Sequence, residues 1–217
     1  MANSAASSEE LSCLLRQIAA GDHSAWGNLL ERHRPRLRRM VELRLDRRLL
    51  GRLDPSDVIQ EAFLTASLQL PGYLKKPTIP LYLWLRLVTG QKLLILHRHH
   101  LGTKARDASL QISIDRGGYP AASSDALATK LIGREPSPSA AACEVEQRRC
   151  LQEALDRMDP IDREVLALRH FEQMTNAEIA QVLGLEPSAA SKRYVRALQR
   201  VKEILSARPG GQGETKA

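Results

Sequence analysis

Basic residues recur at helical spacing near the end of the chain and could bind the phosphates and base edges of DNA. They are Lys192, Arg193, Arg196, Arg200 and Lys202, and no acidic residue lies between Pro187 and Lys202. A guanidinium group can donate two hydrogen bonds to guanine O6 and N7 and so read sequence, whereas phosphate contacts only position a protein. Apolar residues alternate with the basic ones at helical spacing, so the pattern predicts an amphipathic helix with a basic outer face.

A short helix and a tight turn are expected before this basic helix. Thr175 stands three residues before Glu178, which is the spacing of a capping box at a helix start. Gly184 stands where a chain leaving a helix needs a left-handed residue, and Pro187 can occupy the first position of the next helix. The segment from Thr175 to Lys202 therefore predicts a helix-turn-helix whose second helix enters the major groove.

The bulk composition suits a polyanionic partner. The chain has 217 residues and a net charge of +7, enough for one medium domain or two small ones. Its polar, acidic start (MANSAASSEE) is not a signal peptide, and no apolar run approaches the roughly 18 residues of a membrane span. We expect a cytoplasmic protein without membrane insertion. Cys13, Cys143 and Cys150 lack CxxC spacing, so no disulfide framework or metal site is expected.

Helical periodicity runs through most of the chain and predicts an all-α protein of two small helical domains joined by a flexible linker. The expected parts are an N-terminal extension with a first helix (1–22), a first domain (23–101), a linker rich in Ala, Ser, Gly and Pro (102–142), a helix-turn-helix domain (143–207) and a disordered tail (208–217). A linker of this composition could contain one short ordered piece.

Helix starts within the domains are marked by Asp followed by Pro. Asp54 and Asp159 are each expected to cap a helix whose first residue is proline. A Pro- and Gly-containing loop is expected from Leu70 to Pro80, followed by a helix from about Leu81 to His100. These elements complete the first domain.

This layout resembles the bacterial sigma-70 family of RNA polymerase sigma factors, specifically its short extracytoplasmic-function type. Four stretches carry the resemblance: LLERHRPRLRRM (29–40), DVIQEAFLTA (57–66), LYLWLRLVTGQKLLILHRHH (81–100) and the segment 151–205. The family pattern differs at four positions: an acid often stands at Ser56, Asn at Gln91, Ser or Thr at Glu186 and Val at Ala190. These departures leave the scaffold intact and bear on promoter preference.

The resemblance implies a division of labour between the two domains. Asp57, Gln60 and Glu61 would dock core RNA polymerase through the coiled coil of its largest subunit; the alternative is a solvated helix face with Asp57 as a cap. The helix-turn-helix would read the −35 promoter element. The residues implied there are Ser188, Ala189, Lys192, Arg193, Arg196 and Arg200, the last of them at phosphates.

The helix from Tyr82 to His100 and the loop before it would read the −10 element and hold the opened strand. Strand opening needs positive charge for the backbone and flat side chains on which bases can stack. The residues implied are Tyr73, Lys75, Lys76, Tyr82, Arg86, Lys92, Arg98 and His99. A packing role for Tyr73 is an equal alternative, and Trp84 is expected in the core.

Other function classes fit the residues less well. The run from His97 to His100 lacks the i, i+4 spacing of a zinc-binding pair, and no phosphate loop or nucleophile elbow accompanies it, so we expect no enzyme, metal or cofactor. A conventional dimeric helix-turn-helix regulator that binds operator DNA without polymerase is the main alternative. A protein that only sequesters polymerase would not need the basic helix. The resemblance also implies an anti-sigma factor or another inhibitory partner.

Overall fold

The computed structural model describes residues 2–101, 111–112, 119–132 and 141–206, and these residues are almost entirely helical. The predicted tail, 208–217, and most of the predicted linker lie outside them. The helices are α1 (Ala2–Ala19), α2 (His23–Arg44), η1 (Arg47–Leu49), α3 (Pro55–Lys75), α4 (Leu81–Leu101), α5 (Ser124–Ile132), α6 (Ala141–Asp156), α7 (Pro160–Leu166), the π-helical turn η4 (Ala167–Phe171), α8 (Asn176–Leu183) and α9 (Pro187–Ser206). Two two-residue strands, β1 (Gln111–Ile112) and β2 (Tyr119–Pro120), pair antiparallel. None of the described helices combines the length and the apolar character that crossing a bilayer requires.

The first domain is built from α2, α3 and α4, with α1 against α2. Asp22 caps α2 by accepting hydrogen bonds from the N–H groups of Ser24 and Ala25, and Asp54 caps α3 through Ser56 N–H. Helix α3 buries one apolar stripe at helical spacing: Val58, Ile59, Ala62, Phe63 and Ala66. Proline at the first position of α3 confirms the predicted helix start.

The prediction of a loop from Leu70 to Pro80 is wrong over its first half, because α3 continues through Pro71 to Lys75. Leu70 and Tyr73 are buried, and the Tyr73 ring stacks on Trp84 with 4.6 Å between centroids. The Tyr73 hydroxyl also donates a hydrogen bond of 2.9 Å to the Ile79 carbonyl. This packing offsets the roughly 3 kcal/mol that an internal proline costs a helix.

The C-terminal domain contains α6 to α9. Asp159 caps α7 through Ile161 N–H, and Thr175 and Glu178 form the predicted capping box of α8. Gly184 ends α8 at φ 65°, in the left-handed region that favours glycine. Helix α9 then begins at Pro187, which confirms the predicted helix-turn-helix.

Within the predicted linker, residues 119–132 are ordered and include helix α5, a short ordered piece of the kind that the composition allowed. Helix α5 packs on α6, where Arg148 lies 2.5 Å from Asp125, and on α2, where Lys130 lies 2.7 Å from Glu42. The Ser123 N–H donates to the Leu43 carbonyl at 2.8 Å, and Leu127 is fully buried. The described part of the linker therefore lies against both domains.

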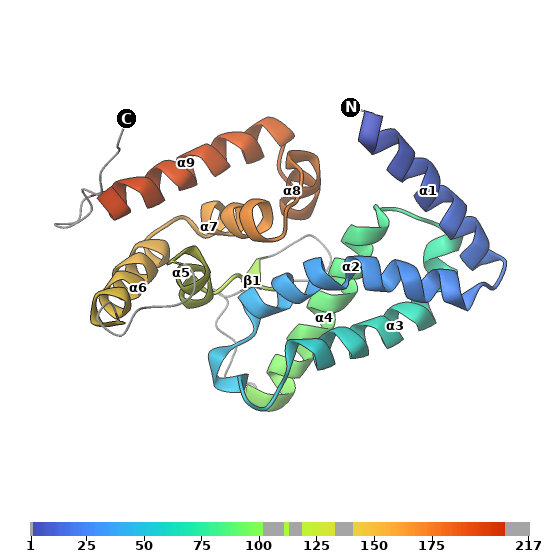
Figure 1. The fold of residues 1–217 in the computed structure, drawn as a ribbon, viewed down its shortest axis with the longest axis horizontal. Helices are drawn as coiled ribbons and strands as arrows, with labels where there is room; N and C mark the ends of the chain where they lie inside the picture. Colours follow the sequence, from blue (N-terminus) through green and yellow to red (C-terminus); the bar gives the residue numbers. More distant parts are fainter. Residues whose placement is uncertain (1, 102–110, 113–118, 133–140, 207–217) are drawn as a thin grey trace.

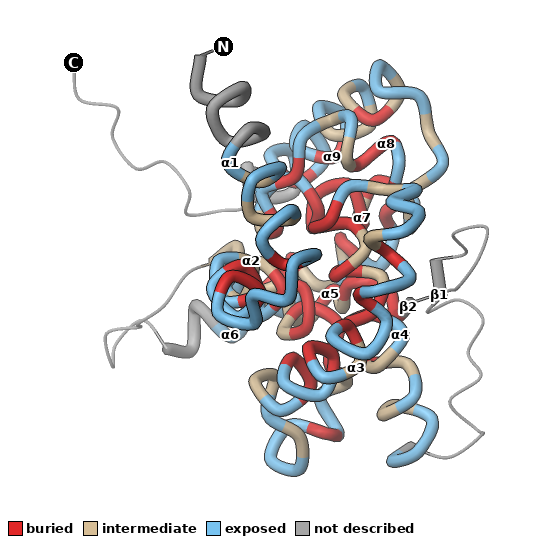
Figure 2. The backbone as a smooth tube through the Cα atoms, turned by 90° about the vertical axis from the view of Figure 1, so that its right-hand side faces the viewer, coloured by how far each residue is buried: buried red, intermediate tan, exposed pale blue. Residues whose placement is uncertain are grey.

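The two domains also pack directly on each other, and we call this the closed arrangement. Helices α7 to α9 lie on one side of α2 and α3 lies on the other (Figure 1). Val165, Leu168 and Met174 of the C-terminal domain belong to the same hydrophobic core as Leu37 and Leu85 of the first domain. Figure 2 shows buried residues in α7 and α8 as well as in α3 and α4. The sequence predicted both domains but not their contact.

Candidate nucleic-acid interface

The outer face of α9 carries exposed positive charge. Ala190, Ala197 and Val201 are buried on its inner face, whereas Leu198 is 39% exposed. Ser188 and Lys192 are exposed, and Ala189 is half-buried. The Arg196 and Arg200 side chains are 67% and 62% exposed. Four of the six residues predicted to read the −35 element are therefore fully accessible, on one helix, as a major-groove helix requires.

Arg193 differs from its neighbours because its guanidinium faces α7 rather than solvent. Its Nη1 lies 2.5 Å from Asp162 Oδ1 and 3.7 Å from Asp159 Oδ1. The hydrogen bond to Asp162 raises the pKa of Arg193 above its ordinary value. In this structure Arg193 ties the recognition helix to α7, so the predicted contact with DNA does not match its orientation.

The three residues predicted to dock polymerase share one exposed face of α3. Asp57, Gln60 and Glu61 are all exposed, and Glu61 lies 3.1 Å from Lys92 of α4. Leu64 and Leu68 continue the same face toward the C-terminus and are 63% and 85% exposed. These two leucines were missed from the sequence, although their spacing of seven and eleven residues from Asp57 places them on its face.

The residues predicted to read the −10 element fall into two groups. Lys75, Lys76, Arg98 and His99 are exposed, and Lys92 is half-buried beside Glu61. Tyr73 packs in the core, which was the alternative to a contact with DNA, because it is buried against Trp84. Trp84 is partly buried and packs against the same core. Tyr82 and Arg86 are also buried, and burial raises the pKa of the Tyr82 phenol. Tyr82 and Arg86 are therefore covered in the closed arrangement, and their contact with DNA stays a prediction.

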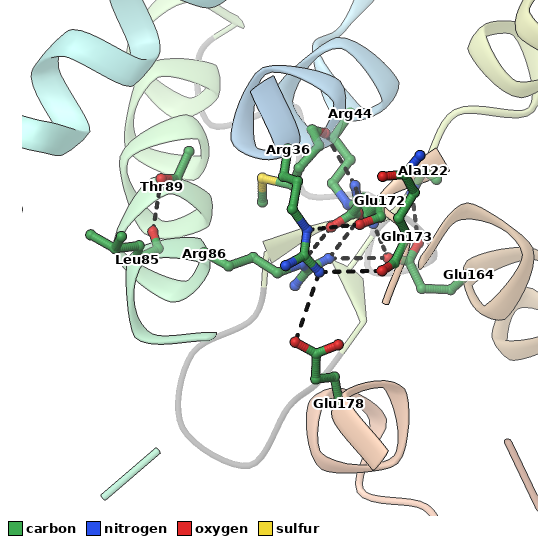
Figure 3. Close-up of polar contacts among 11 residues, drawn as sticks. Arg36, Arg44, Leu85, Arg86, Thr89, Ala122, Glu164, Glu172, Gln173 and Glu178 are labelled. Atoms are coloured by element: carbon green, nitrogen blue, oxygen red, sulfur yellow. Dashed lines mark hydrogen bonds and ion pairs between the residues drawn. The ribbon is translucent and has the colours of Figure 1, made fainter. Parts of the chain in front are cut away.

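Arg86 lies in a buried cluster of four charged residues that joins the domains (Figure 3). Arg44 and Arg86 come from α2 and α4, whereas Glu164 and Glu172 come from the C-terminal domain, and all four side chains are at most 2% exposed. Arg86 Nε lies 2.7 Å from Glu172 Oε2, and Arg44 Nη1 lies 2.7 Å from Glu172 Oε1. Arg44 also pairs with Glu164. We call these four residues the Arg–Glu cluster.

Each carboxylate of the cluster is paired with arginine and accepts hydrogen bonds, as a buried charge requires. Glu164 accepts a further hydrogen bond of 3.0 Å from Ala122 N–H. Burial alone would raise the pKa of Glu172, but the charges of Arg44 and Arg86 and their hydrogen bonds lower it below its ordinary value. The lowered pKa holds Glu172 as a carboxylate between the two arginines. The cluster was missed from the sequence because four residues from four separate elements leave no local spacing signal.

Two more arginines of α2 reach the segment that follows α7. Arg36 Nε donates to the Glu172 carbonyl at 3.1 Å, and its guanidinium carbon lies 3.6 Å from the centre of the Tyr82 ring, a cation–π contact. Arg39 donates to the Phe171 carbonyl at 3.3 Å. The first domain thus presents a set of arginines, and the C-terminal domain supplies the acceptors.

Residues 148–201 match the family model described as "Sigma-70, region 4". The chain is 31% identical over 153 residues to the probable RNA polymerase sigma factor RfaY of Xanthomonas campestris pv. campestris, covering 69% of this chain and 33% of that protein. It is 39% identical over 61 residues to the RNA polymerase sigma-E factor of Streptomyces coelicolor, covering 28% of this chain and 34% of that protein. The chain thus spans about a third of the length of these curated relatives.

The fold is similar to that of a solved structure, CnrH in complex with the cytosolic domain of CnrY. That likeness has a TM-score of 0.51 at 23% identity and covers 91% of this chain and 97% of that chain. It supports the arrangement of helices described above. That likeness concerns the fold alone, whereas the region 4 match and the sigma-factor relatives show that the chain is related to the sigma-70 family of RNA polymerase sigma factors.

Proposed function

We propose that this chain is a transcription initiation factor that binds core RNA polymerase and directs it to promoters. The observation that carries the proposal is the α8–α9 helix-turn-helix, most of which lies in the region 4 match and which exposes Lys192, Arg196 and Arg200. Helix α9 reads the −35 element in this proposal, with the early residues at base edges and Arg200 at phosphates. Such a factor acts in the cytoplasm, where the polymerase is, and has no catalytic activity or cofactor of its own.

The polymerase would bind the exposed face of α3. Asp57, Gln60 and Glu61 offer acceptors to a basic partner helix, and Leu64 and Leu68 add an apolar surface beside them. A rim of polar groups next to exposed leucines is the composition expected of a protein–protein interface. This surface is independent of α9, so docking and −35 recognition can be separated by mutation.

The −10 element would be read by the first domain. Lys75, Lys76, Arg98 and His99 are already exposed and can meet the backbone of an opened strand. An inhibitory protein of the anti-sigma class is the further partner that we propose, since the family resemblance implies one.

Multi-round transcription with purified core polymerase and a genomic promoter library tests this function. New start sites that depend on the chain and share two upstream elements are the expected result. Binding to DNA without new initiation, and a dimer on a palindromic site, would favour the conventional regulator instead.

A further inference from the structure

A basic surface outside the sites described above lies at one end of the first domain. Residues 46–53, DRRLLGRL, lie between α2 and α3 and contain three arginines against one acid; we call them the arginine loop. Arg47, Arg48 and Arg52 are all exposed, as is Leu50 between them. The first domain therefore presents three accessible guanidinium groups on one short segment.

The arginine loop is held in place by its own contacts. Leu49 is buried beneath it, and the Leu49 carbonyl accepts a hydrogen bond of 2.9 Å from Arg52 N–H. Gly51 has φ 96°, in the left-handed region that favours glycine. Asp46 accepts from the backbone N–H of Arg48 and from its guanidinium, through Nε at 3.0 Å and Nη2 at 2.7 Å. Because the segment is already ordered, little conformational entropy is lost when a ligand binds.

The arginine loop lies against the end of α4 (Figure 1). The Asp46 N–H donates a hydrogen bond of 3.3 Å to His97 Nε2, which joins the two segments. Arg98, His99 and His100 are exposed at this end of α4. Since the proposed function assigns Arg98 and His99 to the −10 element, the arginine loop extends that basic surface onto a second segment.

Phosphates of duplex DNA are the partner that fits this surface. Guanidinium groups bind phosphate oxygens through parallel N–H donors, and phosphate contacts are the commonest contacts between proteins and DNA. Helix α4 contains 21 residues and is about 30 Å long, which is the length of about nine base pairs at about 3.4 Å each. In the proposed function the opened strand follows α4 from Lys76 to His99. The arginine loop lies beyond that path, where the DNA returns to a duplex.

We propose that Arg47, Arg48 and Arg52 form a phosphate-binding surface for duplex DNA at the edge of the −10 element. The proposal rests on the proposed function for its place on the promoter, whereas contact with a duplex needs no polymerase. Asp46 lies 2.7 Å from Arg48, which is nonetheless 67% exposed. Asp125 lies 3.6 Å from Arg47, which is 72% exposed. Phosphates can therefore reach both guanidinium groups, and such contacts raise affinity without reading sequence.

The first test uses the full chain with Arg47→Gln, Arg48→Gln and Arg52→Gln. Binding of a fluorescent duplex of mixed sequence is measured by anisotropy over a series of salt concentrations. Each phosphate contact contributes about 0.9 to the slope of log affinity against log salt, so we expect the slope to fall by about two to three and the affinity at low salt by at least about tenfold. Lysine at the same three positions should keep the slope near that of the wild type, because lysine also neutralises phosphate.

The matched control is Arg16→Gln, Arg32→Gln and Arg149→Gln. These arginines are exposed on α1, α2 and α6, outside the arginine loop, so the control removes the same net charge. A change of slope of the same size in the control and in the test variant would overturn the proposal. A lysine variant that loses as much of the slope as the glutamine variant would overturn it too.

A second measurement keeps all three arginines and covers the case in which the glutamine variant fails to fold. Leu50→Cys is labelled with a photoreactive azide in a chain whose Cys13, Cys143 and Cys150 are replaced by serine. Leu50 is 57% exposed in the arginine loop, and Val145→Cys on α6 is the control, since Val145 is 70% exposed. Crosslinking of the duplex from Leu50→Cys and not from Val145→Cys is the expected result. Equal crosslinking from both positions, or none from Leu50→Cys, would refute the proposal.

An anionic membrane is the other surface that arginines beside an exposed leucine could bind. Cosedimentation with vesicles of phosphatidylcholine and phosphatidylserine tests it. Vesicle binding that is lost in the glutamine variant while duplex binding is unchanged would overturn the proposal in favour of a membrane. None of these measurements requires polymerase. A chain whose duplex binding depends on the arginine loop but that starts no transcription contradicts the proposed function alone, and the reverse result contradicts this proposal alone.

Discussion

Arg193 of the recognition helix and Asp162 of α7 form an ion pair of 2.5 Å within the C-terminal domain. Asp162 is only 6% exposed, and Arg196, one turn further along α9, lies 4.0 Å from its other oxygen while remaining open to solvent. Two basic residues with the same apparent role in the sequence are therefore in different environments. One supports the position of α9, and the other is free to meet DNA.

Replacing Arg193 and Arg196 one at a time should show that Arg193 contributes to stability and Arg196 to DNA recognition. Arg193→Ala leaves a buried carboxylate without its main partner, and we expect the free energy of unfolding to fall by about 1–3 kcal/mol. Arg196→Ala should change stability by less than about 0.5 kcal/mol and reduce −35-dependent transcription about tenfold, as loss of one base contact does. Urea denaturation and transcription from a promoter with an intact or altered −35 element measure the two effects. Equal stability losses in both variants would contradict this assignment.

Reversing the charge on the α3 face should prevent polymerase binding. Asp57→Lys with Glu61→Lys places two cations where a basic partner helix is expected, so co-purification with core polymerase should be lost. Leu68→Ser should weaken the complex less, because it removes apolar area only. Gln69→Lys is the control, since Gln69 is exposed on the same helix outside this face. Normal holoenzyme formation by the double variant would show that docking uses another surface.

The capping box should account for a measurable part of the stability of the helix-turn-helix. Thr175 Oγ1 accepts from Glu178 N–H at 3.2 Å, and Glu178 Oε2 accepts from Thr175 N–H at 2.7 Å. Thr175→Ala should lower the free energy of unfolding by about 1 kcal/mol, whereas Thr175→Ser should be nearly neutral. Thermal denaturation followed by circular dichroism compares the two. A loss of the same size in both variants would rule out the hydroxyl as the cause.

Features encoded within a few neighbouring residues could be predicted from the sequence. The caps at Asp54, Asp159 and Thr175, the left-handed Gly184 and the start of α9 at Pro187 each depend on one or two local interactions. The all-α class and the helix-turn-helix followed from them. The exposed faces of α3 and α9 were also predictable, because helical spacing alone determines which side chains share a face.

Features that depend on packing between distant segments could not be predicted. Pro71 and the neighbouring glycine indicate a loop, but Tyr73 packs on Trp84 and keeps the segment helical. Helix α5 has a linker-like composition and is ordered by contacts with α2 and α6. Arg86 looks like a DNA contact in its own segment, and only Glu172, 86 residues away, shows that it is buried. The sequence shows that a residue is charged, but it does not show which residue of opposite charge pairs with it in the fold.

Acid should lower the free energy of unfolding through His33, whose ring lies 5.6 Å from the Tyr82 ring. Burial, together with the charges of Arg36 and Arg32, lowers the pKa of His33 from 6.5 to about 4. His33 therefore takes up a proton near pH 6.5 in the unfolded chain but only near pH 4 in the folded chain. Because protonation favours the unfolded chain, the free energy of unfolding falls as the pH is lowered through this range.

We expect His33 to contribute about 1–2 kcal/mol to this loss, after allowance for solvent screening of a partly exposed ring. Urea denaturation at pH 7 and pH 5 measures it, and His33→Gln should reduce the difference between the two pH values. His23→Gln is the control, since His23 is exposed at the start of α2. Glu172 acts in the same direction but at lower pH, because its pKa is lowered below the ordinary 4.5 and its ion pairs persist until the pH falls through that lower value. A pH 7 to pH 5 difference that is as large in His33→Gln as in the wild type would assign the acid sensitivity to other groups.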